Sequence, residues 1–433
     1  MQRARMSFAL LALAASVVAC HVILGIGDED FRYIAPESQD AAGEDVPARC
    51  PVGHVPPEPP TGADLGKNLP SLVFALSHVD FLAKTDGGTI AGYDLDGKCT
   101  CDARDTSSNA ARRTCVPPDA ADEPCDEDGG VDNALARALR QFTTVAEAFG
   151  VDLSDPVDIA CGRQTVLVIL RNYNGQANDP DVFLSLIPSY GIFQRSDAEL
   201  DGGGAIPDAG CRSFDAGPFP ARFDGTDKWS HLPSHVDEFD VPIIRIAGYV
   251  RDFQLSLNRR DLLAPETVVP LSLGSRIFTV ATPTVTARIV PLDEHGADLR
   301  VLDDGGVVSP GSDTPRSAHG FRLTDGIMAG RMRTSDLLAG LGSLRLSRDR
   351  DDYLCSHAFY AQIKDVLCSS VDTTSRPDLD FMGHACDAVS LGVRFEATRA
   401  LLGQAYEPPE DATDAGCESF QDDCMRRAAG PTR

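Results

Sequence analysis

Residues 242–258 read PIIRIAGYVRDFQLSLN, two short apolar runs with polar residues between them. Runs of this length, rich in Ile, Val, Leu and aromatic residues, are typical of β-strands. Similar runs, separated by Pro, Gly and Asp, follow at 276–281, 285–290, 299–302 and 326–333. Many short strands at this spacing indicate an antiparallel β-sandwich or barrel and not alternating parallel units. We expect the sandwich.

The rest of the body adds strands and helices. Further apolar segments predict strands at 69–83, 165–171, 182–188 and 388–398. The turn formers NYNGQANDPD (172–181) should join two of these strands as a hairpin. Apolar residues at helical spacing predict three helices, which begin at Asp132, at Thr334 and at Asp351. The expected fold is mainly β with accessory helices (α+β), an antiparallel β-sandwich stapled by disulfides, over residues 70–405.

The N-terminus predicts export. MQRARMSFALLALAASVVAC has two arginines and then an apolar run, as a secretory signal does. Residues 17–20, VVAC, resemble the bacterial lipobox, in which the cysteine is lipidated and becomes the mature N-terminus. We therefore expect a signal peptide at 1–19 and a lipid on Cys20, and His21 in place of aspartate favours the outer membrane or cell surface. An uncleaved anchor that runs to Gly27 and an ordinary signal cut elsewhere are the alternatives.

Two segments should flank the body. Residues 20–69 include the Pro-rich stretch HVPPEPPTGADLG and predict a disordered, acidic tether behind the lipidated Cys20. Residues 406–433 predict an acidic C-terminal tail. The body would then be held away from the membrane surface.

The charge of the chain disfavours some partners. There are 39 basic and 65 acidic residues, which gives a net charge of −26. Such a charge repels phosphate backbones and anionic lipid surfaces, so nucleic acid is not an expected partner, whereas cations and cationic partners are. Acidity that only keeps an exported protein soluble is the favoured reading of this charge.

The cysteines support export. Of thirteen cysteines, twelve remain when Cys20 is set aside, an even number that predicts disulfides in an oxidising compartment. A zinc cluster is the alternative, but the sequence has no CxxC pair. If 351–370 is one continuous helix, Cys355 and Cys368 lie about 20 Å apart and cannot pair. We expect Cys386 to pair with Cys368 and Cys417 to pair with Cys424. The twelve candidates are Cys50, Cys99, Cys101, Cys115, Cys125, Cys161, Cys211, Cys355, Cys368, Cys386, Cys417 and Cys424.

Residues 125–135, CDEDGGVDNAL, predict a metal-binding loop. Calcium takes six to eight oxygen ligands on flexible loops in which glycine allows tight turns. The candidate ligands in this stretch are Asp126, Asp128, Asp132 and Asn133. The loop departs from the EF-hand pattern, because its glycines come early and no glutamate closes it. In the alternative reading Asp132 caps the helix that follows, and the other acids favour the positive N-terminal end of that helix.

A second acidic stretch could complete the same site. Asp94 and Asp96 point to one side of an extended chain, because strand side chains alternate. A plain Asp-Gly turn at 96–97 is the alternative. Disulfides among the nearby cysteines would bring Asp94 and Asp96 beside the first loop, and the two half-sites would then form one calcium shell. Chelation of calcium should therefore lower the melting temperature.

Enzyme motifs are mostly lacking. His231 and His235 have the spacing of a zinc helix, but Pro233 breaks the helix and the glutamate base is missing. The sequence has no GxSxG, P-loop or GxGxxG motif. Trp229, the only tryptophan, follows the acidic turn FDGTD (223–227), as a sugar-binding platform would require, but burial in the core is the favoured reading.

Five segments, in this order, resemble a family of uncharacterised myxobacterial surface lipoproteins. They are GYDLDG (92–97), DGGVDNAL (128–135), NYNGQANDPDVFLSL (172–186), FDGTDKW (223–229) and CDAVSLGVRFEA (386–397). The resemblance covers roughly residues 70–405 and implies location and architecture but no reaction.

The sequence therefore predicts an exported, lipid-anchored cell-surface protein with a structural or binding role, in which calcium orders the acidic loops. Its partners would be the membrane, through the lipid, and a surface partner or polysaccharide. A carbohydrate-binding surface protein and a secreted glycosidase-like hydrolase with a carboxylate pair are the alternatives.

Overall fold

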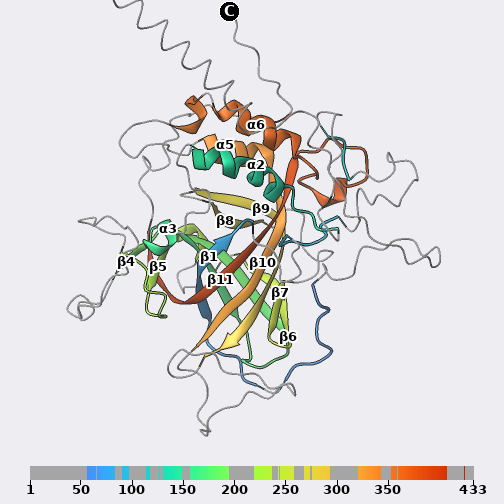
Figure 1. The fold of residues 1–433 in the computed structure, drawn as a ribbon. Coiled ribbons are helices and arrows are strands. Elements are labelled where there is room, and N and C mark those ends of the chain that lie inside the picture. The colour runs from blue at the N-terminus through green and yellow to red at the C-terminus, as the bar shows by residue number, and fades with distance from the viewer. Residues whose placement is uncertain are drawn as a thin grey trace, which may run out of the picture. The chain divides into compact units, whose positions relative to one another are not determined.

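Eight antiparallel strands close into a barrel in the computed structural model (Figure 1). Neighbouring strands around the barrel are β1 (Leu72–Asp80), β2 (Thr165–Arg171), β3 (Asp179–Ser189), β6 (Ile246–Arg251), β7 (Gln254–Leu257), β9 (Arg276–Pro291), β10 (Phe321–Arg333) and β11 (Ala388–Ala405). Pairing of β1 with β11 closes the sheet, with Val73 opposite Ala400 and Asp80 opposite Arg394. The expected sandwich is therefore wrong, because the first and last strands pair with each other instead of forming the edges of two packed sheets.

The structure describes most of the body. The described residues are 56–64, 66–82, 90–96, 114–117, 126, 130–148, 157–194, 219–236, 242, 244–257, 268–273, 276–292, 320–342, 353–357, 359–406 and 424. All of them belong to the unit formed by residues 49–433. Cys20, the signal segment and the predicted strand at 299–302 lie outside the described residues.

Both faces of several barrel strands are buried, as β2 shows. Val166, Val168 and Leu170 belong to the main core. Leu167 and Ile169, which alternate with them, belong to a second apolar cluster on the opposite face of the strand, together with Trp229. In an eight-stranded barrel the interior is just wide enough for side chains to fill. Because both faces of β2 are buried, its sequence is a continuous apolar run without alternating polar residues.

Three strands lie off the barrel ring. β8 (Val268–Leu273) pairs with the first half of β9. β4 (Ile192–Gln194) pairs with β5 (Lys228–His231), and β5 runs parallel to the last part of β11. β5 places Trp229, which is 0% exposed, in the second cluster, so the prediction of a buried core tryptophan is confirmed.

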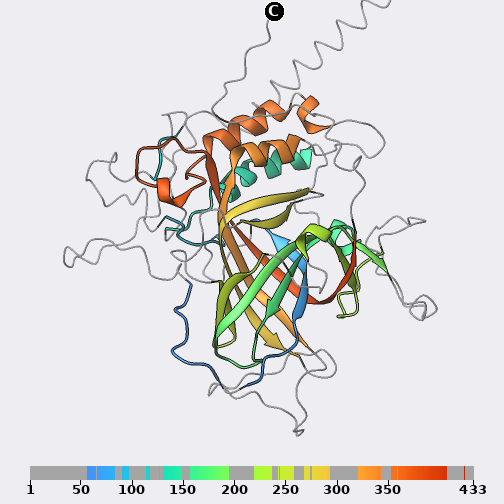
Figure 2. The same ribbon diagram turned by 180° about the vertical axis from the view of Figure 1, so that it is seen from behind.

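Three helices lie together at one end of the barrel (Figure 1), and the opposite view shows the same arrangement (Figure 2). They are α2 (Ala134–Ala148), α5 (Thr334–Gly342) and α6 (Phe359–Ser369), and a single helical turn, α3 (Val157–Ala160), stands apart from them. Their buried apolar residues join the main core. None of the helices in the described part of the chain is long and apolar enough to span a membrane.

The predicted helix at 351–370 is two shorter pieces. A 3-10 turn covers Leu354–Ser356, and α6 begins only at Phe359. His357 between them has φ −92° and ψ 139°, an extended conformation that interrupts the helical hydrogen bonds.

Part of the predicted tether packs on the barrel. The backbone N–H of Leu69 donates to the Tyr173 carbonyl oxygen, and the N–H of Asp64 donates to that of Asn178. The Tyr249 hydroxyl also donates to the Pro57 carbonyl oxygen. The ordered body therefore begins before residue 70.

Two disulfides join described residues. Cys115 pairs with Cys386, and Cys368 on α6 pairs with Cys424. The expected pairs Cys368–Cys386 and Cys417–Cys424 are therefore wrong. Cys161 and Cys355 are also disulfide-bonded. Cys50, Cys99, Cys101, Cys125, Cys211 and Cys417 lie outside the described residues.

Candidate metal centre

Residues 90–96 form a strap on the outer face of the barrel. Tyr93 and Leu95 of this strap pack with Ile327 and Ala329 of β10 in a small apolar cluster. The Tyr93 hydroxyl hydrogen-bonds that of Thr286 on β9 at 2.5 Å. Burial raises the pKa of the Tyr93 phenol to about 12, so the tyrosine stays neutral. These contacts fix the strap on the barrel without involving the side chains of its two aspartates.

Glycine allows the strap to come this close. A Cβ atom on Gly392 of β11 would lie 2.2 Å from the Ala91 carbonyl oxygen, and one on Gly92 would lie 2.6 Å from Cγ1 of Val131. A larger residue at 392 would push the strap from the barrel, and one at 92 would push it from Val131, in the segment before α2.

Asn133 begins the helix that lies beside the strap. Its side-chain oxygen accepts a hydrogen bond from the N–H of Ala136, so Asn133 and not Asp132 is the N-cap of α2. Its amide nitrogen donates to the carbonyl oxygens of Ala91 and Gly392, at 2.7 and 2.8 Å. The amide predicted as a metal ligand thus ties the helix to the strap and the barrel.

Asp132 faces the strap. Its Oδ2 atom accepts hydrogen bonds from the backbone N–H groups of Leu95 and Asp96, at 2.5 and 3.2 Å. Its own N–H donates to the Tyr93 carbonyl oxygen. Asp132 is 6% exposed, so its carboxylate is buried where it meets the strap.

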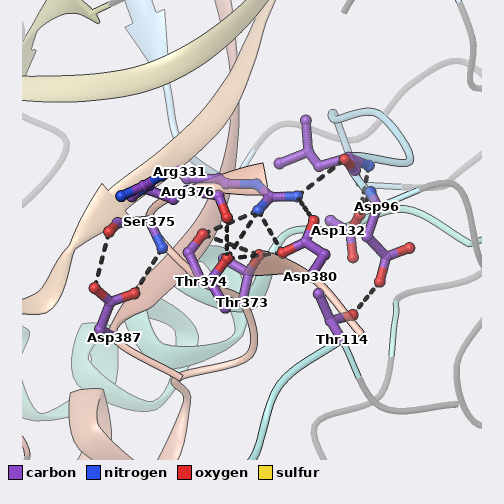
Figure 3. Close-up of polar contacts among 11 residues, drawn as sticks. Asp96, Thr114, Asp132, Arg331, Thr373, Thr374, Ser375, Arg376, Asp380 and Asp387 are labelled. Atoms are coloured by element: carbon purple, nitrogen blue, oxygen red, sulfur yellow. Dashed lines mark hydrogen bonds and ion pairs between the residues drawn. The ribbon is translucent and has the colours of Figure 1, made fainter. Parts of the chain in front are cut away.

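Three aspartates converge at this point. One carboxylate oxygen from each of Asp94, Asp96 and Asp132 lies within 4.8 Å of the other two. Asp94 and Asp96 are partly exposed, and Asp132 is buried. The two sequence segments predicted as half-sites are thus brought together (Figure 3, in which Asp96 and Asp132 are labelled).

The electrostatics of the site disfavour a bare Asp132 carboxylate. Burial raises the pKa of Asp132 well above its ordinary value, and the negative charges of Asp96, Asp126 and Asp372 raise it further. The hydrogen bond from Leu95 opposes this effect only in part. Either a proton or a cation would relieve the same unfavourable charge.

A buried ion pair supports the other side of the strap. Both terminal nitrogens of Arg331 donate to Asp380, at 2.8 and 2.6 Å, and the side chains are 1% and 5% exposed. Arg331 also donates to the Leu95 carbonyl oxygen at 3.2 Å. Figure 3 shows the Arg331 guanidinium between this strap and the loop that carries Asp380. Because Asp380 neutralises Arg331, the arginine fixes the strap without adding a free positive charge.

Several residues of this centre were not predicted from the sequence. Thr114 donates a hydrogen bond to Asp96. Asp372 accepts from the N–H and the hydroxyl of Ser390, and burial raises its pKa. These are single polar residues in long polar segments, and no local pattern distinguishes them from surface residues.

The other acidic residues noted in the sequence are not among the three converging carboxylates. Asp126 contributes charge near Asp132, and Asp128 lies outside the described residues. In the hairpin loop 172–181, Asp179 accepts hydrogen bonds from the N–H groups of Asn174 and Asp181, so it organises the turn. In the turn before Trp229, Asp227 accepts from the N–H groups of Arg222 and Phe223 and has the same kind of role.

The three aspartates suit a hard divalent cation. Calcium–oxygen distances of 2.3–2.6 Å place two ligands of one ion at most about 5 Å apart, which the oxygen spacing at this site satisfies. Three carboxylates can supply three to six of the oxygens that calcium takes, and carbonyl oxygens or water supply the others.

Comparisons with protein families, curated proteins and solved structures find no significant match to this chain.

Proposed function

We propose that the protein is an exported, lipid-anchored cell-surface protein with a structural or binding role, and that calcium stabilises its barrel at Asp94, Asp96 and Asp132. The observation that carries the cation site is the convergence of these three carboxylates within 4.8 Å from two separate segments. A cation there joins the strap to the start of α2.

The disulfides support export. Cys115–Cys386 and Cys368–Cys424 have sequence separations of 271 and 56 residues, so they join distant parts of the chain. Such bonds persist in oxidising compartments and are rare where thiols are kept reduced. Together with the signal segment and the lipobox at Cys20, they favour a location outside the inner membrane.

The two alternative functions have less support. Trp229 is 0% exposed and offers no face to a sugar. A hydrolase needs a raised-pKa carboxyl acid that its substrate can reach. Asp132 has the raised pKa, but at 6% exposure its carboxyl is closed to a glycosidic oxygen.

Thermal unfolding of the purified protein tests the cation site. Calcium at about a hundred times its dissociation constant should stabilise the protein by about 2.7 kcal/mol. We expect a higher melting temperature in CaCl2 than in EGTA, and a much smaller difference in a variant with Asp94→Asn and Asp96→Asn. Asp181→Asn, at an exposed position away from the strap, is the matched control and should respond as the wild type does. Equal melting temperatures in CaCl2 and EGTA would refute the cation site.

Membrane fractionation tests the anchor. Mature protein should start at Cys20 with attached acyl chains and should sediment with membranes, because several chains hold a protein stably. Cys20→Ala should abolish both the mass increase and the sedimentation. Unmodified Cys20 in membrane-extracted protein would contradict the anchor but would leave the cation site standing.

A further inference from the structure

We propose that the Cys115–Cys386 disulfide completes the cation site, so that the chain binds calcium more tightly when these two cysteines are oxidised. This inference rests on the proposed calcium site and concerns its regulation. It assigns Thr114 the role of a positioning residue for Asp96.

The disulfide lies next to a residue that contacts the cation site. Cys115, whose Cα atom lies 5.0 Å from that of Cys386, directly follows Thr114. The Thr114 hydroxyl donates to Oδ2 of Asp96, one of the three converging carboxylates. The covalent bond is therefore one residue away from a hydrogen bond to a predicted ligand.

Other contacts also hold segment 114–116. Val116 exchanges two backbone hydrogen bonds with the chain around the disulfide: its N–H donates to the His384 carbonyl oxygen, and its carbonyl oxygen accepts from the Cys386 N–H. The Thr114 carbonyl oxygen accepts from the N–H of Phe381. Cys115 is 3% exposed and packs in the main core, whereas Val116 is 49% exposed. The disulfide adds a covalent link to these contacts, and without it Thr114 is placed by the core packing of its neighbour and three backbone hydrogen bonds.

One loop carries both the disulfide and the partner of Arg331. Residues 377–386 carry Cys386 at one end and, near the other, Asp380, which binds Arg331. Arg331 donates to the Leu95 carbonyl oxygen, and the Leu95 N–H donates to Asp132. The loop thus contacts Asp96 through Thr114 and supports the Leu95 backbone that donates to Asp132.

Oxidation balances as ordinary thiol–disulfide exchange. The Cys115 and Cys386 thiols form one S–S bond and pass two protons and two electrons to the disulfide of a thiol oxidoreductase, which is reduced to its dithiol. Before this step Thr114 lacks the covalent tie of its neighbour to Cys386, so the hydroxyl that positions Asp96 is held less firmly and the cation has to order this ligand itself. A cation that must order its own ligands binds more weakly than one that meets a preformed site.

Calorimetric titration with CaCl2 tests the inference on the full chain. A variant with Cys115→Ser and Cys386→Ser should bind calcium at least about tenfold more weakly, the factor that corresponds to 1.4 kcal/mol. The matched control, Cys368→Ser with Cys424→Ser, removes a disulfide that takes no part in the hydrogen bonds of the site and should keep the wild-type affinity. Wild-type affinity in the Cys115/Cys386 variant would overturn the inference.

A second pair of variants serves if the double cysteine variant does not fold. Thr114→Val keeps the disulfide and removes the hydroxyl, and it should weaken calcium binding by about tenfold, because Asp96 loses the hydrogen bond that positions it. Thr114→Ser should restore the affinity. Equal affinities in the wild type, Thr114→Val and Thr114→Ser would overturn the inference. If the wild type binds no calcium, the proposed calcium site is refuted, and this inference is refuted with it.

Discussion

Asp132 accepts a 2.5 Å hydrogen bond from the backbone N–H of Leu95, 37 positions away in the sequence. This contact fixes the strap on the start of α2 and buries a carboxylate among other acids. The same residue therefore holds the fold together and carries an unfavourable charge, and the two effects can be separated by substitution.

Asp132→Asn should stabilise the protein in EGTA and abolish most of the stabilisation by calcium. The asparagine carbonyl oxygen can still accept from Leu95 and Asp96, while the buried negative charge is removed. Melting curves in EGTA and in CaCl2 measure both effects. A variant that is less stable than the wild type in EGTA would show that the charge is not unfavourable.

The same charge predicts a pH dependence in EGTA. The pKa of Asp132 in the folded protein is raised, so the folded state binds more protons than the unfolded chain. Its contribution to the free energy of unfolding is complete below the unfolded value of about 4 and is lost as the pH rises through the folded pKa. Urea titrations at a series of pH values measure how the free energy of unfolding changes with pH. Asp132→Asn should remove the part of this pH dependence that Asp132 contributes, and an unchanged pH dependence would contradict the prediction.

Gly392→Ala should destabilise the protein and weaken calcium binding together. The added Cβ atom would lie 2.2 Å from the Ala91 carbonyl oxygen, which forces the strap from β11. Overpacking of this kind costs about 1–3 kcal/mol. Urea unfolding and calcium titration measure the two effects.

Gly62→Ala is the matched control for this substitution. A Cβ atom on Gly62 would meet nothing within 4 Å, so stability and calcium affinity should stay close to those of the wild type. A tolerated Gly392→Ala would show that the strap does not lie as closely on the barrel as described.

The strands could be predicted from the sequence, but not how they close. Apolar runs such as 165–171 and 388–398 indicate strands, because this signal depends only on residues that are close together in the sequence. Whether the sheet folds into a sandwich or a barrel depends on the pairing of β1 with β11, more than 300 residues apart. Leu167 and Val168 are both buried, one in each cluster, so both faces of the strand are apolar. The sequence therefore does not show which face points into the barrel.

The candidate site shows the same division. Acid-rich, glycine-bearing stretches pointed to Asp94, Asp96 and Asp132, which the structure brings together. The roles of Asn133 and Arg331 depend on partners that are distant in the sequence, Gly392 and Asp380. The disulfide connectivity could likewise not be predicted from the sequence, since the spacing of the cysteines excludes some pairs but selects none.

Asp380→Asn should destabilise the protein strongly. It leaves the Arg331 guanidinium, which is 1% exposed, without its charged partner, and such a loss costs about 3–5 kcal/mol. Combining Asp380→Asn with Arg331→Met removes both charges and should cost less than the sum of the two single substitutions. Urea unfolding of all four proteins measures the coupling, and strict additivity would argue against the buried pair.

Trp229 provides an optical test of the fold. As the only tryptophan, and 0% exposed, it should show blue-shifted emission that iodide hardly quenches until the protein unfolds. Trp229→Ala should cost about 3–5 kcal/mol, because the indole fills the cluster between β5 and the outer face of β2. Leu401→Ala on β11, where the side chain is 39% exposed, is the control and should change stability by no more than about 0.5 kcal/mol. Quenching as efficient as that of free tryptophan would mean that the ring is exposed and that the second cluster does not hold β5 on the barrel. Loss of polysaccharide binding without loss of stability in Trp229→Ala would mean that the ring faces a ligand.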